Sequence, residues 1–155
     1  MVVKKFHKNR FKSREQTLPI RLILIREKKL IESHYEFLNC KIKDTKLVCT
    51  GVVKPTKHSK EYSIKLIYDG LNAPRVYVVE PEIEYHDDIH IYPKEGNLCL
   101  YHPAIDNFHW NYRKNNVHDT IIPWALEWFV YYELYQITGK WKHPFVAHNL
   151  NKEEN

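Results

Sequence analysis

The sequence has little glycine, few cysteines and no long hydrophobic run. Its four glycines include neither a GxxxxGK nor a GxGxxG pattern, which argues against a glycine-rich phosphate-binding loop. No run approaches the ~18–20 apolar residues of a membrane span, and residues 1–14 lack the apolar stretch of a signal peptide. Without an export signal, we expect the three cysteines, Cys40, Cys49 and Cys99, to be reduced thiols in a cytoplasmic protein.

Excess positive charge is missing from most of the chain, although the formal net charge is +5. Residues 1–30 carry ten Lys and Arg against two acids, whereas residues 31–155 carry fourteen against seventeen. The basicity therefore belongs to the N-terminus, and residues 1–16 are expected to form a basic flexible arm. A protein partner is the first expectation for this arm and nucleic acid only the second.

What the chain does contain is typical of one globular domain. It has 155 residues with 43% hydrophobic and 28% charged side chains, enough to bury a core without a metal or a disulfide. The 21 aromatic residues predict large packed faces. We expect a domain over residues 17–150 and a short tail over 151–155.

The order of elements predicts an α+β fold. Apolar spacing favours a helix over residues 20–36, and β-branched or alternating segments at 46–54, 61–68 and 75–80 predict an antiparallel meander. Residues 82–116 show no sustained period, and an irregular stretch of that length is usually functional. A second helix is expected to begin at Asp119 or Thr120 and stop near Gly139. It is apolar nearly all round, so we expect it to be mostly buried.

Residues 86–103 carry the side chains with the most chemistry, and two interpretations rest on residue type alone. The first is a metal site, because zinc favours such ligands; the candidates are His86, His90, Cys99 and His102. The absence of CxxC and HExxH patterns weakens it. The second is a nucleophilic dyad of Cys99 with His102 or His90, in which the imidazole removes the thiol proton. Cys40 and Cys49 are expected to be small core residues instead.

The same segment carries motifs that point to a known family. His90, followed by Gly96-Asn97-Leu98-Cys99-Leu100, resembles the ubiquitin-conjugating enzyme family, whose motif is a histidine-containing turn followed by Gly-x-Ile/Leu-Cys-Leu. Residues 120–128 (TIIPWALEW), 131–133 (YYE) and 138–141 (TGKW) resemble the bacterial branch of that family. In particular, they are similar to the stand-alone conjugating-enzyme-like proteins of antiphage CBASS operons.

This resemblance implies a ubiquitin-conjugating-enzyme-like fold: an N-terminal helix, an antiparallel meander, an irregular cysteine-bearing segment and a long C-terminal helix. It also implies an acyl transferase that acts through a Cys99 thioester, with no cofactor or metal. The thioester would carry a protein C-terminus, with a cGAS/DncV-like nucleotidyltransferase as the first candidate, and pass it to a lysine or another amine. An activating enzyme is a candidate further partner.

The sequence departs from the His-Pro-Asn triplet of the eukaryotic ubiquitin-conjugating enzymes that it resembles. His90 is present, but Ile91 and Tyr92 stand where Pro and Asn would be expected. The oxyanion-stabilising role therefore stays open between Asn97, Asn107 and His102, in that order.

Other interpretations stay open beside the resemblance. His90 either orients the loop or takes part in proton transfer. Among the tryptophans, mostly expected in packing, Trp110 is the best candidate to line the active-site groove. The rival functions are a non-catalytic interaction module and a metal-dependent enzyme that uses the four ligand candidates above.

Overall fold

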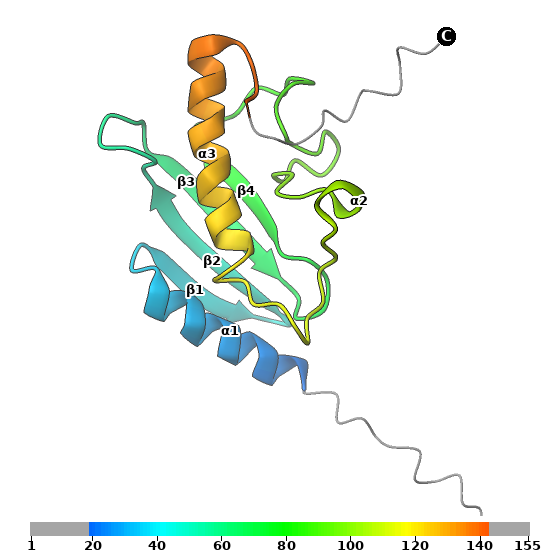
Figure 1. The fold of residues 1–155 in the computed structure, drawn as a ribbon. Helices are drawn as coiled ribbons and strands as arrows, with labels where there is room; N and C mark the ends of the chain where they lie inside the picture. The colour runs from blue at the N-terminus through cyan, green and yellow to red at the C-terminus, as the bar shows by residue number, and fades with distance from the viewer. Residues whose placement is uncertain (1–18, 143–155) are drawn as a thin grey trace, which may run out of the picture.

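The computed structural model describes residues 19–142, so the predicted arm and tail lie outside the described residues. In chain order its elements are α1 (Ile20–His34), β1 (Leu38–Lys43), β2 (Lys46–Val53), β3 (Tyr62–Tyr68), β4 (Arg75–Glu80), α2 (Pro103–Asp106) and α3 (Ile121–Thr138). α3 lies across one face of the sheet, and α1 lies beside β1 (Figure 1). The α+β expectation is confirmed.

The sheet is a four-stranded antiparallel meander in the order β1-β2-β3-β4. The three strands expected from the sequence are confirmed, but β1 was missed. Its signal was present, since Leu38 and Cys40 are buried while Asn39 and Lys41 are not. Such alternation is the mark of a half-buried strand. The turn after β1 uses Asp44 in the left-handed region, at φ 54°, which aspartate tolerates better than most residues.

α1 begins at residue 20 as expected but ends at His34, two residues before the expected end, whereas the limits of α3 agree with the sequence. Thr120 precedes the first residue of α3, and Gly139 ends the helix at φ 70° with its N–H donating to the carbonyl of Tyr135. The expectation that α3 is mostly buried is only half right. Phe129 is fully buried, whereas Ile137 is 82% exposed. The C-terminal half of the helix extends past the residues that cover the sheet.

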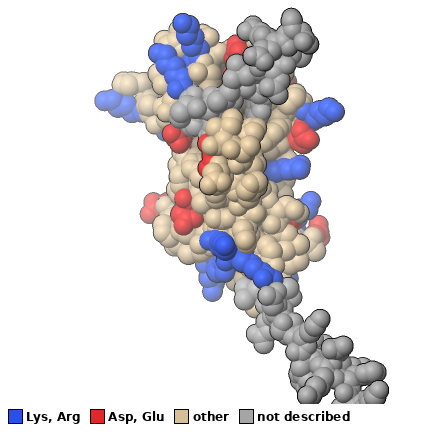
Figure 2. All heavy atoms as spheres, turned by 45° about the vertical axis from the view of Figure 1, so that its right-hand side comes forward, with Lys and Arg blue, Asp and Glu red and all other residues tan. Residues whose placement is uncertain are grey.

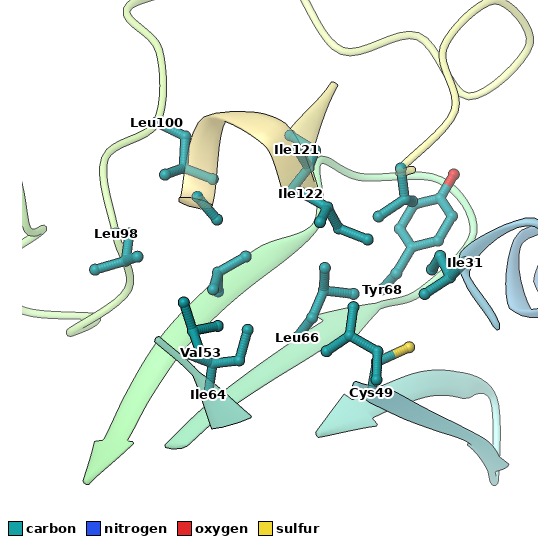
Figure 3. Close-up of a cluster of buried hydrophobic side chains, with 14 of the residues drawn as sticks. Ile31, Cys49, Val53, Ile64, Leu66, Tyr68, Leu98, Leu100, Ile121 and Ile122 are labelled. Atoms are coloured by element: carbon teal, nitrogen blue, oxygen red, sulfur yellow. The ribbon is translucent and has the colours of Figure 1, made fainter. Parts of the chain in front are cut away.

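One apolar core joins the sheet to both helices. Side chains from alternate positions of β2 and β3 point towards the start of α3, as Figure 3 shows for Val53, Ile64 and Leu66 opposite Ile121 and Ile122. Alternate residues of a strand share a face, so this pattern places one face of the meander on the core.

Two of the cysteines belong to this sheet. Cys40 and Cys49 are directly opposite each other on β1 and β2, and the structure joins them in a disulfide. The expectation of three reduced thiols is therefore wrong for this pair, because the register of two antiparallel strands brings their side chains together. Their expected place in the core is confirmed, since they are 1% and 0% exposed.

Between β4 and α3 the chain is largely irregular, as expected. It forms one short helix, α2, and an isolated antiparallel bridge between Ile91 and Leu98. This segment lies beside the sheet and α3, on the right-hand side of Figure 1. Within residues 19–142, neither α1 nor α3 has the combination of length and apolar character that crossing a bilayer requires.

Candidate active site around Cys99

A small backbone hairpin positions the motif residues. The Cys99 N–H donates to the His90 carbonyl at 2.8 Å, the Tyr92 N–H to the Asn97 carbonyl at 2.9 Å, and the Gly96 N–H to the Tyr92 carbonyl at 2.8 Å. Gly96 has a φ of 75°, which glycine adopts without a steric penalty. The hairpin therefore folds the 90–92 triplet back alongside Cys99.

Cys99 faces away from the core although its neighbours face into it. Leu98 and Leu100 belong to the core cluster and are drawn among its members in Figure 3. The Leu98 N–H donates to the Val76 carbonyl at 2.8 Å, which ties the segment to β4. Because successive side chains of an extended segment point to opposite sides, Cys99 is directed to the other side of the segment. It is 4% exposed but lies outside the core cluster.

The groups around the sulfur shift the pKa of Cys99 in opposite directions. Burial raises the pKa of the Cys99 thiol, the Tyr92 hydroxyl lowers it through a hydrogen bond to the sulfur, and the Asp106 charge raises it. The sulfur also lies 3.8 Å from the Tyr101 carbonyl oxygen. A thiolate is the nucleophilic form of cysteine, so Tyr92 is the neighbour that favours the reactive form.

His90 holds the hairpin through its backbone. Its carbonyl accepts the Cys99 N–H and also the Trp128 indole N–H, at 2.9 Å. The ring of His90 stacks on Trp141 with centroids 4.9 Å apart. These contacts support the orienting role for His90. They also anchor the cysteine-bearing segment to α3.

The other predicted candidates are placed differently. Asn97 is 8% exposed, and its side-chain oxygen is buried and has no hydrogen-bond partner among residues 19–142. It lines a neighbouring cavity rather than the one beside Cys99. His102 precedes α2, and its N–H donates to an Asp106 carboxylate oxygen at 2.6 Å. Asn107 ends α2 at φ 49° and lines the Cys99 cavity.

The four metal-ligand candidates do not form a metal site. No three His, Cys, Asp or Glu side chains among residues 19–142 are grouped so that they could hold an ion together. His90 and Cys99 line one cavity, whereas His86 and His102 do not line it. The rival interpretation of a metal-dependent enzyme therefore lacks its ligand set.

A cavity of about 370 Å³ opens beside Cys99. Its buried residues are His90, Cys99, Leu100 and Trp128, its partly exposed residues are Tyr101, Phe108, Trp124 and Trp141, and its exposed residues are Asp106, Asn107 and Glu127. The buried end thus holds the sulfur, aromatic rings form the sides, and two carboxylates lie at the rim. Around this side of the molecule the space-filling view shows a mainly uncharged middle, with Lys and Arg nearer the edges (Figure 2).

Several of these residues escaped the sequence analysis. Trp110 was expected to line the groove, but it packs edge-on against Tyr68 with ring centroids 5.5 Å apart and is not among the residues that line the cavity. The helix tryptophans Trp124 and Trp128 line it instead. Their spacing of four residues predicted a shared helix face, but not which part of the chain that face would meet. Tyr92 was noted only as a departure from the triplet.

The meander, the cysteine-bearing hairpin and the following long helix together define a protein of the ubiquitin-conjugating-enzyme-like class. A profile of the family described as type II CBASS E2 protein matches residues 27–149, and the chain belongs to this family. No curated protein matches the chain.

Proposed function

We propose that this E2-like protein carries the C-terminus of another protein as a thioester on Cys99 and transfers it to an amine. The observation that supports this most is the position of Cys99. It is the one cysteine outside the disulfide, it faces away from the core, and its sulfur meets a hydroxyl donor and a cavity.

The chemistry is a two-step acyl transfer. First, the Cys99 thiolate attacks the carbonyl carbon of an activated C-terminus, the activating group leaves, and a thioester forms. Second, an amine attacks that carbonyl carbon, the C–S bond breaks, and an amide and the Cys99 thiolate result. Splitting the transfer into two steps replaces one difficult step with two easier ones.

The cavity supports an amine as the acceptor. Asp106 and Glu127 place carboxylates at its rim, and no lysine or arginine is among the described residues that line it. Aromatic walls and carboxylates together favour a cation on an apolar stem, which is the chemistry of a lysine side chain. The Asp106 carboxylate would attract the ammonium group to the cavity, and the amine that forms when this group loses a proton to solvent attacks the thioester.

Membership of the CBASS E2 family implies interaction with other CBASS proteins. We propose that the carried C-terminus belongs to a cGAS/DncV-like nucleotidyltransferase, that the acceptor is a lysine or other amine of a target protein, and that an activating enzyme takes part if the C-terminus arrives unactivated. The basic arm, residues 1–16, is proposed as a protein-docking segment.

The test is reconstitution followed by intact-mass measurement. The full chain is incubated with the nucleotidyltransferase of its operon, with and without a candidate activating enzyme. An adduct is expected whose mass is the sum of both chains less one water. It should be absent from the Cys99→Ala variant and retained in Tyr85→Phe, a matched change on the same irregular segment. An adduct that persists in Cys99→Ala would refute the proposal.

A second candidate is a non-catalytic interaction module. The observation that favours it is a row of exposed apolar side chains on α3, namely Val130, Leu134 and Ile137. Exposed apolar groups that follow one helix face suit a protein partner. In the same reconstitution, co-purification of wild type and Cys99→Ala with the partner, without any adduct, would select this module.

A further inference from the structure

The departure from the eukaryotic His-Pro-Asn triplet at position 92 has a structural consequence. Tyr92 stands where the resemblance would place an asparagine, and the hairpin brings it next to Cys99. The backbone bonds that pair residue 92 with 97 and residue 90 with 99 fix this placement. From there the Tyr92 hydroxyl hydrogen-bonds to the Cys99 sulfur.

We propose that Tyr92 is a catalytic residue: its hydroxyl donates a hydrogen bond to the Cys99 thiolate before acylation and to the carbonyl oxyanion during transfer. The second half of this proposal rests on the function proposed above, whereas the first half concerns the cysteine alone. The tyrosine would thus supply the donor that an asparagine is expected to supply in relatives with the intact triplet.

The phenol is suited to this because it stays protonated. Tyr92 is 36% exposed, but partial burial of its hydroxyl raises the pKa of Tyr92, and the hydrogen bond to Cys99 and the negative charges of Cys99, Tyr101 and Glu95 raise it further. A phenol whose pKa is raised keeps its proton when the neighbouring thiol ionises. It therefore acts as a donor to the anion and does not compete with Cys99 for the negative charge.

The other candidates for the oxyanion role are less well placed. Asn97 lines the same neighbouring cavity as Tyr92, and its backbone carbonyl accepts the Tyr92 N–H. The His102 N–H is used within α2 by Asp106. Asn107 lines the Cys99 cavity, but no hydrogen bond between its side chain and the sulfur is among the contacts of the described residues. Tyr92 is distinguished by its hydrogen bond to the reacting sulfur, not by a place in the Cys99 cavity, which it does not line.

The transfer step can be followed atom by atom. The amine nitrogen attacks the thioester carbon, and the carbonyl π electrons move to oxygen, which becomes an oxyanion. The Tyr92 O–H then donates to that oxygen. The oxygen is close to the sulfur because both atoms are bonded to the same carbon. When the intermediate collapses, the oxyanion electrons re-form the C=O bond, the C–S bond electrons leave with sulfur, the attacking nitrogen loses its extra proton to a carboxylate or to solvent, and Tyr92 donates to the thiolate again. Donors aimed at the oxyanion accelerate such steps by stabilising developing charge.

The thiolate half is tested by the pH dependence of Cys99 alkylation. Iodoacetamide is reacted with the full, folded, non-reduced chain between pH 6 and 10, and labelling of Cys99 is followed by peptide mass. In Tyr92→Phe the apparent pKa of Cys99 should rise by about one pH unit, since a hydrogen bond to a charged group has that order of strength. The rate near neutral pH should fall about tenfold, whereas the plateau at high pH should be unchanged.

Matched variants separate this role from a structural one. Tyr85→Phe removes another phenol that donates to a carboxylate, that of Asp87 at 3.0 Å, and should leave the Cys99 profile as in wild type. A merely structural role for Tyr92 would alter the plateau rate through access to the sulfur and leave the apparent pKa in place. An unshifted apparent pKa in a folded Tyr92→Phe protein would overturn the proposal.

The oxyanion half is tested on Cys99 acylated by exchange with a small glycyl alkyl thioester. Decay of the acyl-enzyme in the presence of Nα-acetyl-lysine is measured by intact mass. Tyr92→Phe should slow the transfer about 10–1000-fold, the range found when an oxyanion donor is removed. Tyr92→Asn, which installs the amide of the eukaryotic triplet, should recover part of that loss. Equal transfer rates in wild type and Tyr92→Phe would overturn this half.

Failure of the inference and failure of the proposed function give different results. If Tyr92→Phe shifts the apparent pKa of Cys99 in alkylation but no thioester forms in the reconstitution, Tyr92 is the thiolate donor and the conjugation function is refuted. If the Cys99 thioester forms and transfers as well in Tyr92→Phe as in wild type, the conjugation function is supported and the role of Tyr92 is refuted.

Discussion

Cys49 and Cys99 are both buried, at 0% and 4% exposure, but the regions around them are built in different ways. Cys49 lies on a central strand, paired through backbone hydrogen bonds on both sides, and its sulfur meets Cys40 across the sheet. Cys99 lies on a hairpin with few backbone bonds, and its sulfur meets a phenol and a cavity. Burial alone therefore does not distinguish a structural cysteine from a candidate nucleophile.

The two regions differ in how the neighbours of each side chain are determined. In the sheet, register alone determines the neighbours of each residue. In the segment between β4 and α3, the neighbours come from contacts with α3, such as the Trp128 indole on the His90 carbonyl. The sheet thus stabilises the fold. The irregular segment is the region in which side chains from different elements can meet at one candidate site.

The largest effect is expected from a change in the shared core. Phe129 is fully buried and packs on Tyr62 with ring centroids 4.8 Å apart. Phe129→Ala should lower the free energy of unfolding by about 3–5 kcal/mol, measured by urea denaturation. Ile137→Ala, at an 82% exposed position of the same helix, should change it by less than about 0.5 kcal/mol. Similar losses in both variants would contradict the described packing of α3.

A smaller and more local loss of stability is expected at the contact between α3 and the hairpin. Trp128→Phe removes the indole donor to the His90 carbonyl and should cost about 1–3 kcal/mol. Amide hydrogen exchange should quicken for residues 90–99 more than for β2 and β3, because the sheet keeps its own hydrogen bonds. Uniform acceleration across both regions would show that the hairpin does not depend on α3 in this way.

Glu27 connects α1 to the irregular segment and makes stability depend on pH. It is fully buried on α1, and its carboxylate accepts the Val117 N–H at 3.0 Å. Burial raises the pKa of Glu27 above its ordinary value of 4.5. The folded state thus favours the protonated carboxyl, and stability that is full below pH 4.5 is lost as pH rises through the raised pKa.

Glu27→Gln should remove this slope while keeping an oxygen for Val117. The expected gain at neutral pH is about 1.4 kcal/mol for each unit by which the pKa is raised, measured as the free energy of unfolding in urea between pH 4 and 8. Glu36→Gln, at an exposed position, should keep the wild-type slope. A Glu27→Gln protein with an unchanged slope would contradict the burial of this carboxylate as its cause.

The last prediction concerns the number of thiols that can be alkylated, and it involves no change in the sequence. Alkylation of the unfolded, non-reduced chain should add one label, at Cys99, and prior reduction should raise the number to three, because Cys40 and Cys49 are joined. Intact mass gives the count. Three labels without reduction would contradict the disulfide and restore the expectation of three thiols.

Much of the fold was predictable because its signals are local. Alternation in residues 61–68 and 75–80 predicted strands, and Thr120 with Gly139 predicted the limits of the long helix. β1 was missed because its short alternating stretch follows a helix pattern without a clear break. The disulfide depends on register between two strands, and one of those strands had not been recognised.

The site was predictable only in part. Cys99 and His90 came from a motif, and the structure places both at one cavity. Asp106, Glu127 and Trp124 reach that cavity from α2 and α3, and no spacing in the sequence shows that these elements converge. Tyr92 was visible as a departure from the triplet, but its contact with the sulfur depends on the hairpin that the backbone forms.

The most direct test of the central claim is the chemical nature of the bond at Cys99. After reconstitution, the wild-type adduct should be cleaved by added thiol at neutral pH. The Cys99→Ser adduct, an oxygen ester, should resist thiol and yield to hydroxide, and Cys99→Ala should form no adduct. A wild-type adduct that survives excess thiol, or one whose linkage maps to a residue other than Cys99, would contradict the thioester account.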